Sequence, residues 1–382
     1  MRSKIAALTC ALMLTGCGSA GTAAPEPVAS LPAPPAPGAS TPPSPGPSSS
    51  AAPTKSAPPK PAPALPSPGN PDGEAVVPAE AKAVDTSKPD RVIGTGTPAS
   101  CTSAAVVKAV AAGGKITFDC GPAPVTITMK ATAKVRNDHG PDVVLDGGGR
   151  VTLSGAGKRR ILYQNTCDQA QRFTTSHCQD QPTPRLTVQN LTFKDGDSTG
   201  DTTEGGGGGA IFVRGGRLKV VNSRFTGNRC DATGPDLGGA AIRALSQSRN
   251  RPVYIVHSTF SGGVCANGGA LSSIGVSWTV LNSVFTGNKA IGRGANPARG
   301  GTPGGGSGGA IYTDGNLFTV TLSGTVVRDN RANEGGGAIF FVSNDRTGTL
   351  TLKSSSLKRN RSAGFETAGQ PGIFFLGARI NR

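Results

Sequence analysis

Short stretches of alternating apolar and polar residues recur along this chain between residues 188 and 360. Six of them align on one frame: VQNLTFKDG, VVNSRFTGN, IVHSTFSGG, VLNSVFTGN, LSGTVVRDN and LKSSSLKRN. Turn-forming residues follow most of them, and none has the periodicity of an amphipathic helix, so the pattern predicts strands. The frame returns after 32, 35, 25, 42 and 30 residues, while the offsets inside each motif stay fixed.

The sixth position of every segment is apolar, and it is Phe in the first four. These positions are Phe193, Phe225, Phe260, Phe285, Val327 and Leu357. Each unit then reaches a second motif: GGAIF, GGAAIR, GGALS, GGAIY, GGAIF or PGIFF. Such regular return predicts the stacked rungs of a parallel β-helix, with the sixth positions forming an internal column. Gly or Asn three residues later would turn the chain, because both tolerate left-handed backbone angles.

The paired FTGN and GGAI motifs resemble the repeats of polymorphic outer membrane proteins and of related right-handed β-helix proteins in the pectate-lyase-like superfamily. This resemblance implies an all-β fold, a right-handed parallel β-helix solenoid, over residues 91–382. It also implies an N-terminal cap in which a short helix at residues 103–111 plugs the first coil, with the next coil at residues 143–155. The superfamily holds lyases, hydrolases, esterases and non-enzymatic adhesins, so the fold does not fix an activity.

Six cysteines follow residue 100, and an even number in an exported domain indicates disulfides. Cys230 and Cys265 both lie five residues after a column Phe, which places them on adjacent rungs roughly 4.8 Å apart. Disulfides join Cα atoms separated by roughly 4.4 to 6.8 Å, so this pair is predicted to be bridged. Cys101 would pair with Cys120 to tie the cap helix to the first strand, and Cys167 with Cys178 to close a loop.

The first 17 residues, MRSKIAALTCALMLTGC, have two basic residues followed by a short apolar run. This pattern is typical of an export signal at residues 1–16, and LTGC resembles a bacterial lipobox, which would make Cys17 a lipidated membrane anchor. The alternative is an ordinary secretion signal that contains a Cys. Residues 17–90 are rich in Pro, Ala and Ser, and are predicted to be a disordered spacer.

The net charge of +16 comes almost entirely from residues 101–382. An exported protein meets little nucleic acid, so acidic polysaccharide or a cell-wall polymer is the expected partner. The alternative is that the charge excess maintains solubility or reflects codon usage.

Candidate binding residues lie in the GGAI strands, which long insertions precede. Such insertions emerge on one side of a solenoid, often its binding side. The Ile position of the motif is apolar in every unit and is predicted to face inward, so the next position faces outward. That column holds a possible carbohydrate-binding platform of aromatic residues and Arg: Phe212, Arg243, Tyr312, Phe340 and Phe374. The alternatives are that the alternation is inverted or that neighbouring loops cover these rings.

Acidic residues are dense only in the loop DGDSTGDTTE, which contains Asp195, Asp197, Asp201 and Glu204. Their oxygen atoms are ligands that calcium accepts, but the spacing is not that of an EF-hand. The alternative is that the loop is simply acidic and solvated. Outside this loop, Asp314 of the GGAI strands has no other acid near it in the sequence. His257 occupies a slot that other repeats fill with Asn, so it is predicted to join a structural ladder of stacked side chains.

Together these features predict an exported surface lipoprotein that binds polysaccharide or cell-surface material and is non-catalytic. The alternative is a carbohydrate-active enzyme, most plausibly a lyase acting on acidic polysaccharide. The lyase would require acids and an Arg or Lys from different rungs to converge in one groove.

Overall fold

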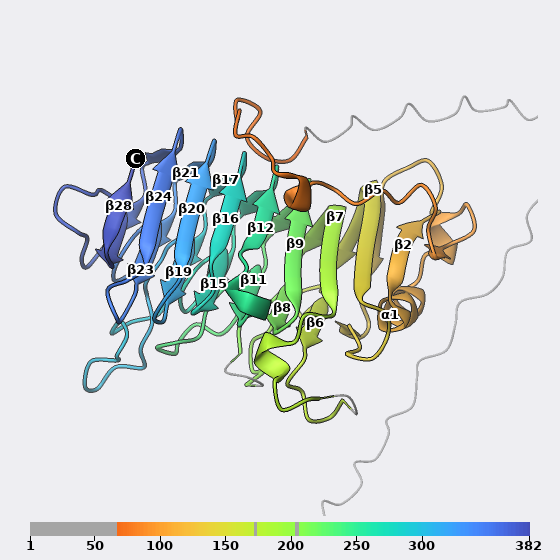
Figure 1. Ribbon diagram of the computed structural model, residues 1–382, viewed down its shortest axis with the longest axis horizontal. Coiled ribbons are helices and arrows are strands. Elements are labelled where there is room, and N and C mark those ends of the chain that lie inside the picture. The colour runs from red at the N-terminus through yellow and green to blue at the C-terminus, as the bar shows by residue number, and fades with distance from the viewer. Residues whose placement is uncertain (1–66, 172–173, 203–205) are drawn as a thin grey trace, which may run out of the picture. The chain divides into compact units, whose positions relative to one another are not determined.

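The chain winds into a parallel β-helix, as predicted, in a computed structural model that describes residues 67–171, 174–202 and 206–382 (Figure 1). The predicted signal at residues 1–16, Cys17 and most of the predicted spacer lie outside the described residues. Successive coils place strands of one motif side by side, and every strand pairing in the described part of the chain is parallel apart from two isolated bridges in one loop.

The described strands form a long sheet with two rows, a second sheet and a narrow third one. The front row of the long sheet contains β1 (Arg91–Ile93), β2 (Gly114–Phe118), the first parts of β5 (Asp142–Ser154) and β7 (Arg185–Lys194), β9 (Arg217–Val221), β12 (Val253–Val256), β16 (Trp278–Leu281), β20 (Thr319–Ser323), β24 (Thr349–Lys353) and β28 (Arg379–Asn381). The return row contains β3 (Val125–Thr128), the last parts of β5 and β7, β10 (Arg224–Thr226), β13 (Thr259–Ser261), β17 (Val284–Thr286), β21 (Val326–Arg328) and β25 (Ser356–Lys358).

The second sheet carries the GGAI motifs. Its strands are β4 (Ala133–Lys134), β6 (Leu162–Asn165), β8 (Ile211–Arg214), β11 (Ile242–Leu245), β15 (Leu271–Ile274), β19 (Ile311–Asp314), β23 (Ile339–Val342) and β27 (Ile373–Leu376). The narrow sheet contains β14 (Val264–Cys265), β18 (Lys289–Ala290), β22 (Arg331–Ala332) and β26 (Arg361–Ser362). Short 3-10 helices lie at Ala79–Ala81, Pro98–Ser100, Cys178–Asp180 and Ser248–Asn250.

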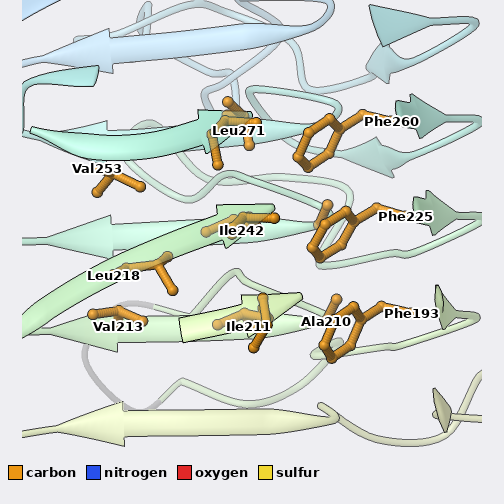
Figure 2. Close-up of a cluster of buried hydrophobic side chains, with 14 of the residues drawn as sticks. Phe193, Ala210, Ile211, Val213, Leu218, Phe225, Ile242, Val253, Phe260 and Leu271 are labelled. Atoms are coloured by element: carbon orange, nitrogen blue, oxygen red, sulfur yellow. The ribbon is translucent and has the colours of Figure 1, made fainter. Parts of the chain in front are cut away.

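The predicted Phe column forms the centre of the core (Figure 2). Phe193, Phe225, Phe260 and Phe285 are buried, and consecutive ring centroids lie 4.9, 4.6 and 4.7 Å apart in nearly parallel planes. Each stacked pair adds about 0.5 to 1.5 kcal/mol to what burial of the rings contributes. The predicted inward Ile position of the GGAI strands packs against these rings, for example at Ile211 and Ile242.

Two ladders of polar side chains run parallel to the Phe column. In one, the backbone N–H of Ser223 donates to Ser258 Oγ, and that of Ser258 donates to Ser283 Oγ, at 3.1 Å each. In the other, Asn288 Nδ2 donates to Asn330 Oδ1 at 2.9 Å. These buried side chains satisfy backbone groups at the corners between strands, where the backbone cannot pair regularly.

The position of the turns differs in part from the prediction. The Asn three residues after Phe is a buried ladder residue, and the residue before it has the left-handed backbone, as at Gly287 (φ 66°) and Asp329 (φ 58°). The Asn slot earlier in the motif does turn the chain, as at Asn222 (φ 47°). His257 has the same left-handed turn (φ 43°), but within the described residues its ring makes no hydrogen bond to the ladder.

The N-terminal cap and the disulfides agree with the prediction. Helix α1 (Ser103–Ala112) buries Val106 and Val110 against the first coil. The bridges are Cys101–Cys120, Cys167–Cys178 and Cys230–Cys265, with Cα atoms 5.7, 5.0 and 4.8 Å apart. The predicted Gly-Gly corner is also present, because a Cβ on Gly309 would collide with the carbonyl oxygen of Gly337.

The predicted spacer boundary at residue 90 is wrong, because residues 67–90 lie along the β-helix as a strap. The strap crosses the corner between the two rows of the long sheet and exchanges hydrogen bonds with several rungs. Asn282 Oδ1 accepts from Ala75 N at 2.8 Å, and Gln189 Oε1 accepts from Val84 N at 2.8 Å. A small apolar cluster of Ala81 with Val221, Val256 and Leu281 completes the attachment. Composition indicated disorder, but hydrogen bonds to the rungs and the burial of Ala81 attach this segment to the solenoid.

Candidate functional site

The predicted binding column faces outward from the second sheet but is not exposed. Register places Tyr163, Phe212, Arg243, Ser272, Tyr312, Phe340 and Phe374 side by side on consecutive strands. Phe212 and Tyr312 are 0% exposed and Phe340 is 3% exposed, while Phe374 is partly exposed. The exposed sugar platform is therefore wrong, because the long insertions fold over these rings. The structure instead agrees with the alternative that neighbouring loops cover the rings.

Arg160 fixes the described parts of the first covering loop, residues 195–202 and 206–209, onto the column. Its guanidinium carbon lies 5.1 Å from the ring centroid of Phe212, and the side chain donates to the carbonyl oxygens of Gly207 and Gly208. Arg160 also forms an ion pair with Asp201 of the same loop. A buried guanidinium with several acceptors holds the loop in one position.

The predicted calcium site is not formed by the acids that the structure describes. Asp201 is paired with Arg160, and Asp195 lies 3.8 Å from the Lys194 ammonium. Asp197 accepts from the backbone N–H of Thr199, which closes a local turn. No group of three or more His, Cys, Asp or Glu side chains that could hold a metal occurs in the described parts of the chain. Glu204 lies outside the described residues.

Farther along the same face, two carboxylates from different rungs meet in a cavity of about 470 Å³. Asp314 ends β19, and Asp236 comes from the insertion before β11. Apolar side chains form part of the lining, together with two carboxamides; the lining residues are Asp236, Ile274, Asn296, Pro297, Asp314, Gly315, Phe340, Val342 and Asn344. Asp314 is thus not isolated in the fold, unlike in the sequence.

Asn296 connects the two acids. Its Nδ2 lies 2.6 Å from Asp236 Oδ1, 2.8 Å from Tyr312 Oη and 2.9 Å from Asp314 Oδ2, so its two N–H groups are shared among three acceptors. The two carboxylate oxygens that share this nitrogen are therefore at most about 5.5 Å apart. Asn344 Nδ2 donates to the other oxygen of Asp314 at 3.1 Å.

The loop that carries Asn296 is fixed by an ion pair at its base. Arg299 donates to both carboxylate oxygens of Glu334, at 2.9 and 3.0 Å, and Gly294 N donates to Glu334 Oε1 at 2.8 Å. Glu334 is buried, and burial alone would raise its pKa, but the bonds from Arg299 and Gly294 outweigh that effect and lower it. A bidentate pair of this kind determines the direction in which the loop projects.

Burial and a neighbouring negative charge raise the pKa values of acidic groups in the cavity. Burial raises the pKa of Asp314, and the neighbouring charge of Asp236 raises it further. Burial also raises the pKa of Tyr312 well above its usual value, so its hydroxyl stays protonated and can donate. Both carboxylates lie within hydrogen-bond distance of the neutral Asn296 Nδ2, which offsets part of their repulsion.

Arg243 supplies a positive charge next to this cavity. The residue is 3% exposed, its Nη1 donates to Ser272 Oγ at 2.6 Å, and its Nε has no hydrogen-bond partner in the described part of the structure. Burial lowers the pKa of Arg243 to about 10, whereas Tyr312, Asp236 and Asp314 act to raise it. The acids and Arg of different rungs therefore converge in one place, as the enzyme alternative requires, although not the acids that the sequence indicated.

Sequence reasoning found Tyr312, Phe340 and Arg243 but missed Asp236, Asn296 and Asn344. The missed residues lie in insertions of different lengths, where the repeat gives no register. The available signal was that two of the insertions contain a polar residue beside Pro, in GPDLG and ANPAR.

One family model matches the chain. Residues 282–314 match the Chlamydia polymorphic membrane protein (Chlamydia_PMP) repeat; this range contains strands β17, β18 and β19 and ends at Asp314. No curated protein and no solved structure matches the chain. Within the described residues no helix is long and apolar enough to cross a membrane. The match supports a β-helix repeat protein associated with a bacterial surface or outer membrane.

Proposed function

We propose that this chain is a surface lipoprotein that binds carbohydrate in the cavity between Asp236 and Asp314. The observation that carries the proposal is the composition of that cavity: two carboxylates and two carboxamides beside an apolar wall of Phe340, Ile274 and Val342. Ligand sites of this kind combine apolar lining with a few polar groups that set orientation.

The polar groups match the hydroxyls of a sugar. A carboxylate accepts several hydrogen bonds, and a carboxamide both accepts and donates, so neighbouring hydroxyls can be bound as pairs. Asp236 is exposed and receives one side-chain bond, from Asn296, so acceptor capacity remains for a ligand. The apolar wall suits the C–H face of a pyranose ring.

Glycoside hydrolysis is the second candidate function, because two carboxylates lie within about 5.5 Å of each other and one has a raised pKa. Retaining glycosidases have two carboxyl groups about 5 to 5.5 Å apart, one acting as acid and one as nucleophile. The raised pKa of Asp314 suits a general acid. Against hydrolysis, Asn296 Nδ2 occupies the space between the carboxylates, where a scissile bond would have to lie. Binding is therefore the better supported function.

The lyase alternative is weaker in this cavity. Such a lyase uses an Arg or Lys as base, and Arg243 is the cation close to both acids. Its side chain is buried and one of its nitrogens donates to Ser272, so a substrate carbon would not reach it without movement of the covering loops.

The binding proposal is tested with Asp236→Asn and Asp314→Asn. A glycan array identifies a ligand for the unmodified protein, and isothermal titration then measures its affinity for each variant. Because hydrogen bonds to a charged group are the strong ones, either variant is expected to weaken binding about tenfold or more. Glu366→Gln, which removes an exposed carboxylate outside the cavity, is the control and is expected to bind normally.

Two results would overturn the proposal. Affinity unchanged in both cavity variants would place the ligand elsewhere. Release of reducing ends from the bound glycan by the unmodified protein, lost in Asp236→Asn and Asp314→Asn, would replace binding by hydrolysis.

A further inference from the structure

A second cleft lies on the outer face of the front row, on a different sheet from the Asp236 cavity. It has a volume of about 360 Å³ and is lined by side chains of β2, β5, β7, β9 and β12 together with the strap. Its cations are Lys115, Arg185, Arg217 and Lys219, and Tyr254 of β12 lines it as well. Glu80 and Val84 of the strap form one wall.

Strand register explains why these cations gather. Lys219 pairs with Tyr254 on one side and with Thr187 on the other, and that column continues to Lys115 through Val144. Arg185 pairs with Arg217, two residues earlier on the same strands, so both columns point to the same face. Neighbouring strands lie roughly 4.8 Å apart, so Arg185 and Arg217 are close neighbours, whereas the rungs that carry Val144 and Thr187 separate Lys115 from Lys219.

The cations of the cleft are only partly neutralised by the described residues. Arg185 forms a bidentate pair with Asp142, at 2.7 Å for both bonds. Lys219 Nζ donates to the backbone carbonyls of Glu80 and Lys82, which carry no net charge. In the described part of the chain the guanidinium of Arg217 makes no hydrogen bond or ion pair.

The electrostatic effect of this crowding is consistent with an open anion site. Burial lowers the pKa of Lys219, and the positive charge of Arg217 lowers it further. Burial also lowers the pKa of Arg217, with an added effect from Arg251. Cations that repel one another in a partly desolvated cleft are stabilised by a bound anion.

We propose that this cleft binds the carboxylates of an acidic polysaccharide that lies along the solenoid axis. Lys115 and Lys219 lie three rungs apart in one column, and Arg185 and Arg217 lie on adjacent rungs in the other. Positive groups spread over several rungs suit an extended polymer with repeated charges better than a single small anion. Beyond Tyr254 the same column continues as Thr279, Thr321 and Thr351, whose hydroxyls extend the polar track. This site is separate from the proposed carbohydrate cavity. The cleft is basic and takes an acidic ligand, whereas the Asp236 cavity is itself acidic.

The test measures binding of polygalacturonate oligosaccharides to the full chain by isothermal titration at low and high salt. Arg217→Gln removes the cation whose guanidinium has no hydrogen-bond or ion-pair partner among the described residues, and is expected to weaken binding about tenfold. Arg217→Lys keeps the charge and is expected to retain most of the affinity. Binding of the unmodified protein should fall as salt is added, because the contact is electrostatic.

Arg379→Gln is the matched control. Arg379 is exposed on β28 of the same row, at the far end of the solenoid, and does not line the cleft. Its substitution changes the net charge equally and is expected to leave the affinity unchanged. An equal loss in both variants would show non-specific attraction and overturn the site.

Other probes separate the competing partners. Neutral dextran is expected not to bind. Binding of phosphatidylglycerol vesicles or polyphosphate that depends on Arg217, without binding of polygalacturonate, would overturn the assignment to polysaccharide. Asp236→Asn is expected to leave polygalacturonate binding unchanged, so failure of the cavity proposal and failure of this one give different results.

Discussion

At the scale of single residues, the molecule depends on side chains that replace regular backbone pairing at its corners. Asn330 shows this most clearly, because it is 1% exposed and occupies the middle of the Asn ladder. Its Nδ2 donates to the backbone oxygen of Phe285 at 3.1 Å and to Asn360 Oδ1 at 2.9 Å, and its Oδ1 accepts from Asn288. Each bond joins one rung to the next.

Asn330→Ala is expected to lower the free energy of unfolding by about 2 to 4 kcal/mol, since it leaves several buried donors and acceptors without partners. Denaturant titration followed by fluorescence of Trp278, the one tryptophan of the chain, measures the change. The exposed Asn316→Ala is the comparison and is expected to change stability little. Equal stability of the two variants would show that the ladder is not stabilising.

Only some residues of the Asp236 cavity could be predicted from the sequence. Register follows from the repeat, so the inward column and the neighbouring column that holds Tyr312 and Phe340 were predictable. Exposure was not, because it depends on loop contacts such as those of Arg160, which lies over the Phe212 ring and binds the carbonyl oxygen of Gly207. Asp236 and Asn296 approach Asp314 through loop paths that no periodicity describes.

At the scale of elements, the strap is attached through one buried acid as well as through backbone bonds. Asp146, at the corner of β5, accepts from Thr86 of the strap at 2.7 Å and from Gln189 and Asn190 of β7. Burial alone would raise the pKa of Asp146, but these donors and Gly148 N outweigh burial and lower it. Its ionised form is therefore stabilised in the fold.

The sign of the pH effect follows from this lowered pKa. Asp146 contributes stability that is fully present above its usual value of about 3.9 and is lost as the pH falls through the lower value it has in the fold. Hydrogen exchange of residues 75–86 is expected to accelerate in that acid range before exchange in the core does. In Asp146→Asn the strap is expected to exchange faster at neutral pH and to lose the acid dependence. An unchanged acid dependence in that variant would assign it to another group.

The strap also marks a limit of compositional reasoning. The segment from residue 67 to 90 reads as part of the Pro-rich spacer, yet it buries Ala81 and hydrogen-bonds to Gln189 and Asn282. These contacts depend on groups that the folded solenoid presents, so no local pattern within the strap could reveal them. The fold itself was predictable because each rung repeats the same local signals.

At the scale of the whole molecule, the two proposed sites lie on different sheets of one solenoid and differ in charge. The Asp236 cavity on the second sheet is acidic, and the Arg217 cleft on the front row is basic. The two proposals together predict that the protein holds two chemically distinct glycans at once. Both sites depend on segments outside the repeat: the long insertions in the first case and the strap in the second.

Attachment of the whole molecule to a membrane is a separate prediction. Cys17→Ala is expected to move the protein from the membrane fraction to the soluble fraction of the producing cells and to abolish incorporation of radiolabelled fatty acid. Immunoblotting of the fractions and autoradiography measure both effects, with Cys10→Ala as the matched control. A chain that stays in the membrane fraction and never carries label would contradict lipidation.

The path of the strap has a mechanical consequence. The chain joins the solenoid along its flank, where Gly69 N bonds to Thr259 and Ala75 to Asn282, before it runs back toward the cap helix. A pull applied through the preceding residues therefore loads the middle rungs from the side and peels these bonds one at a time. Each bond that breaks frees more of the strap while the stacked coils stay intact. The strap therefore takes up tension that would otherwise reach the first coil and helix α1.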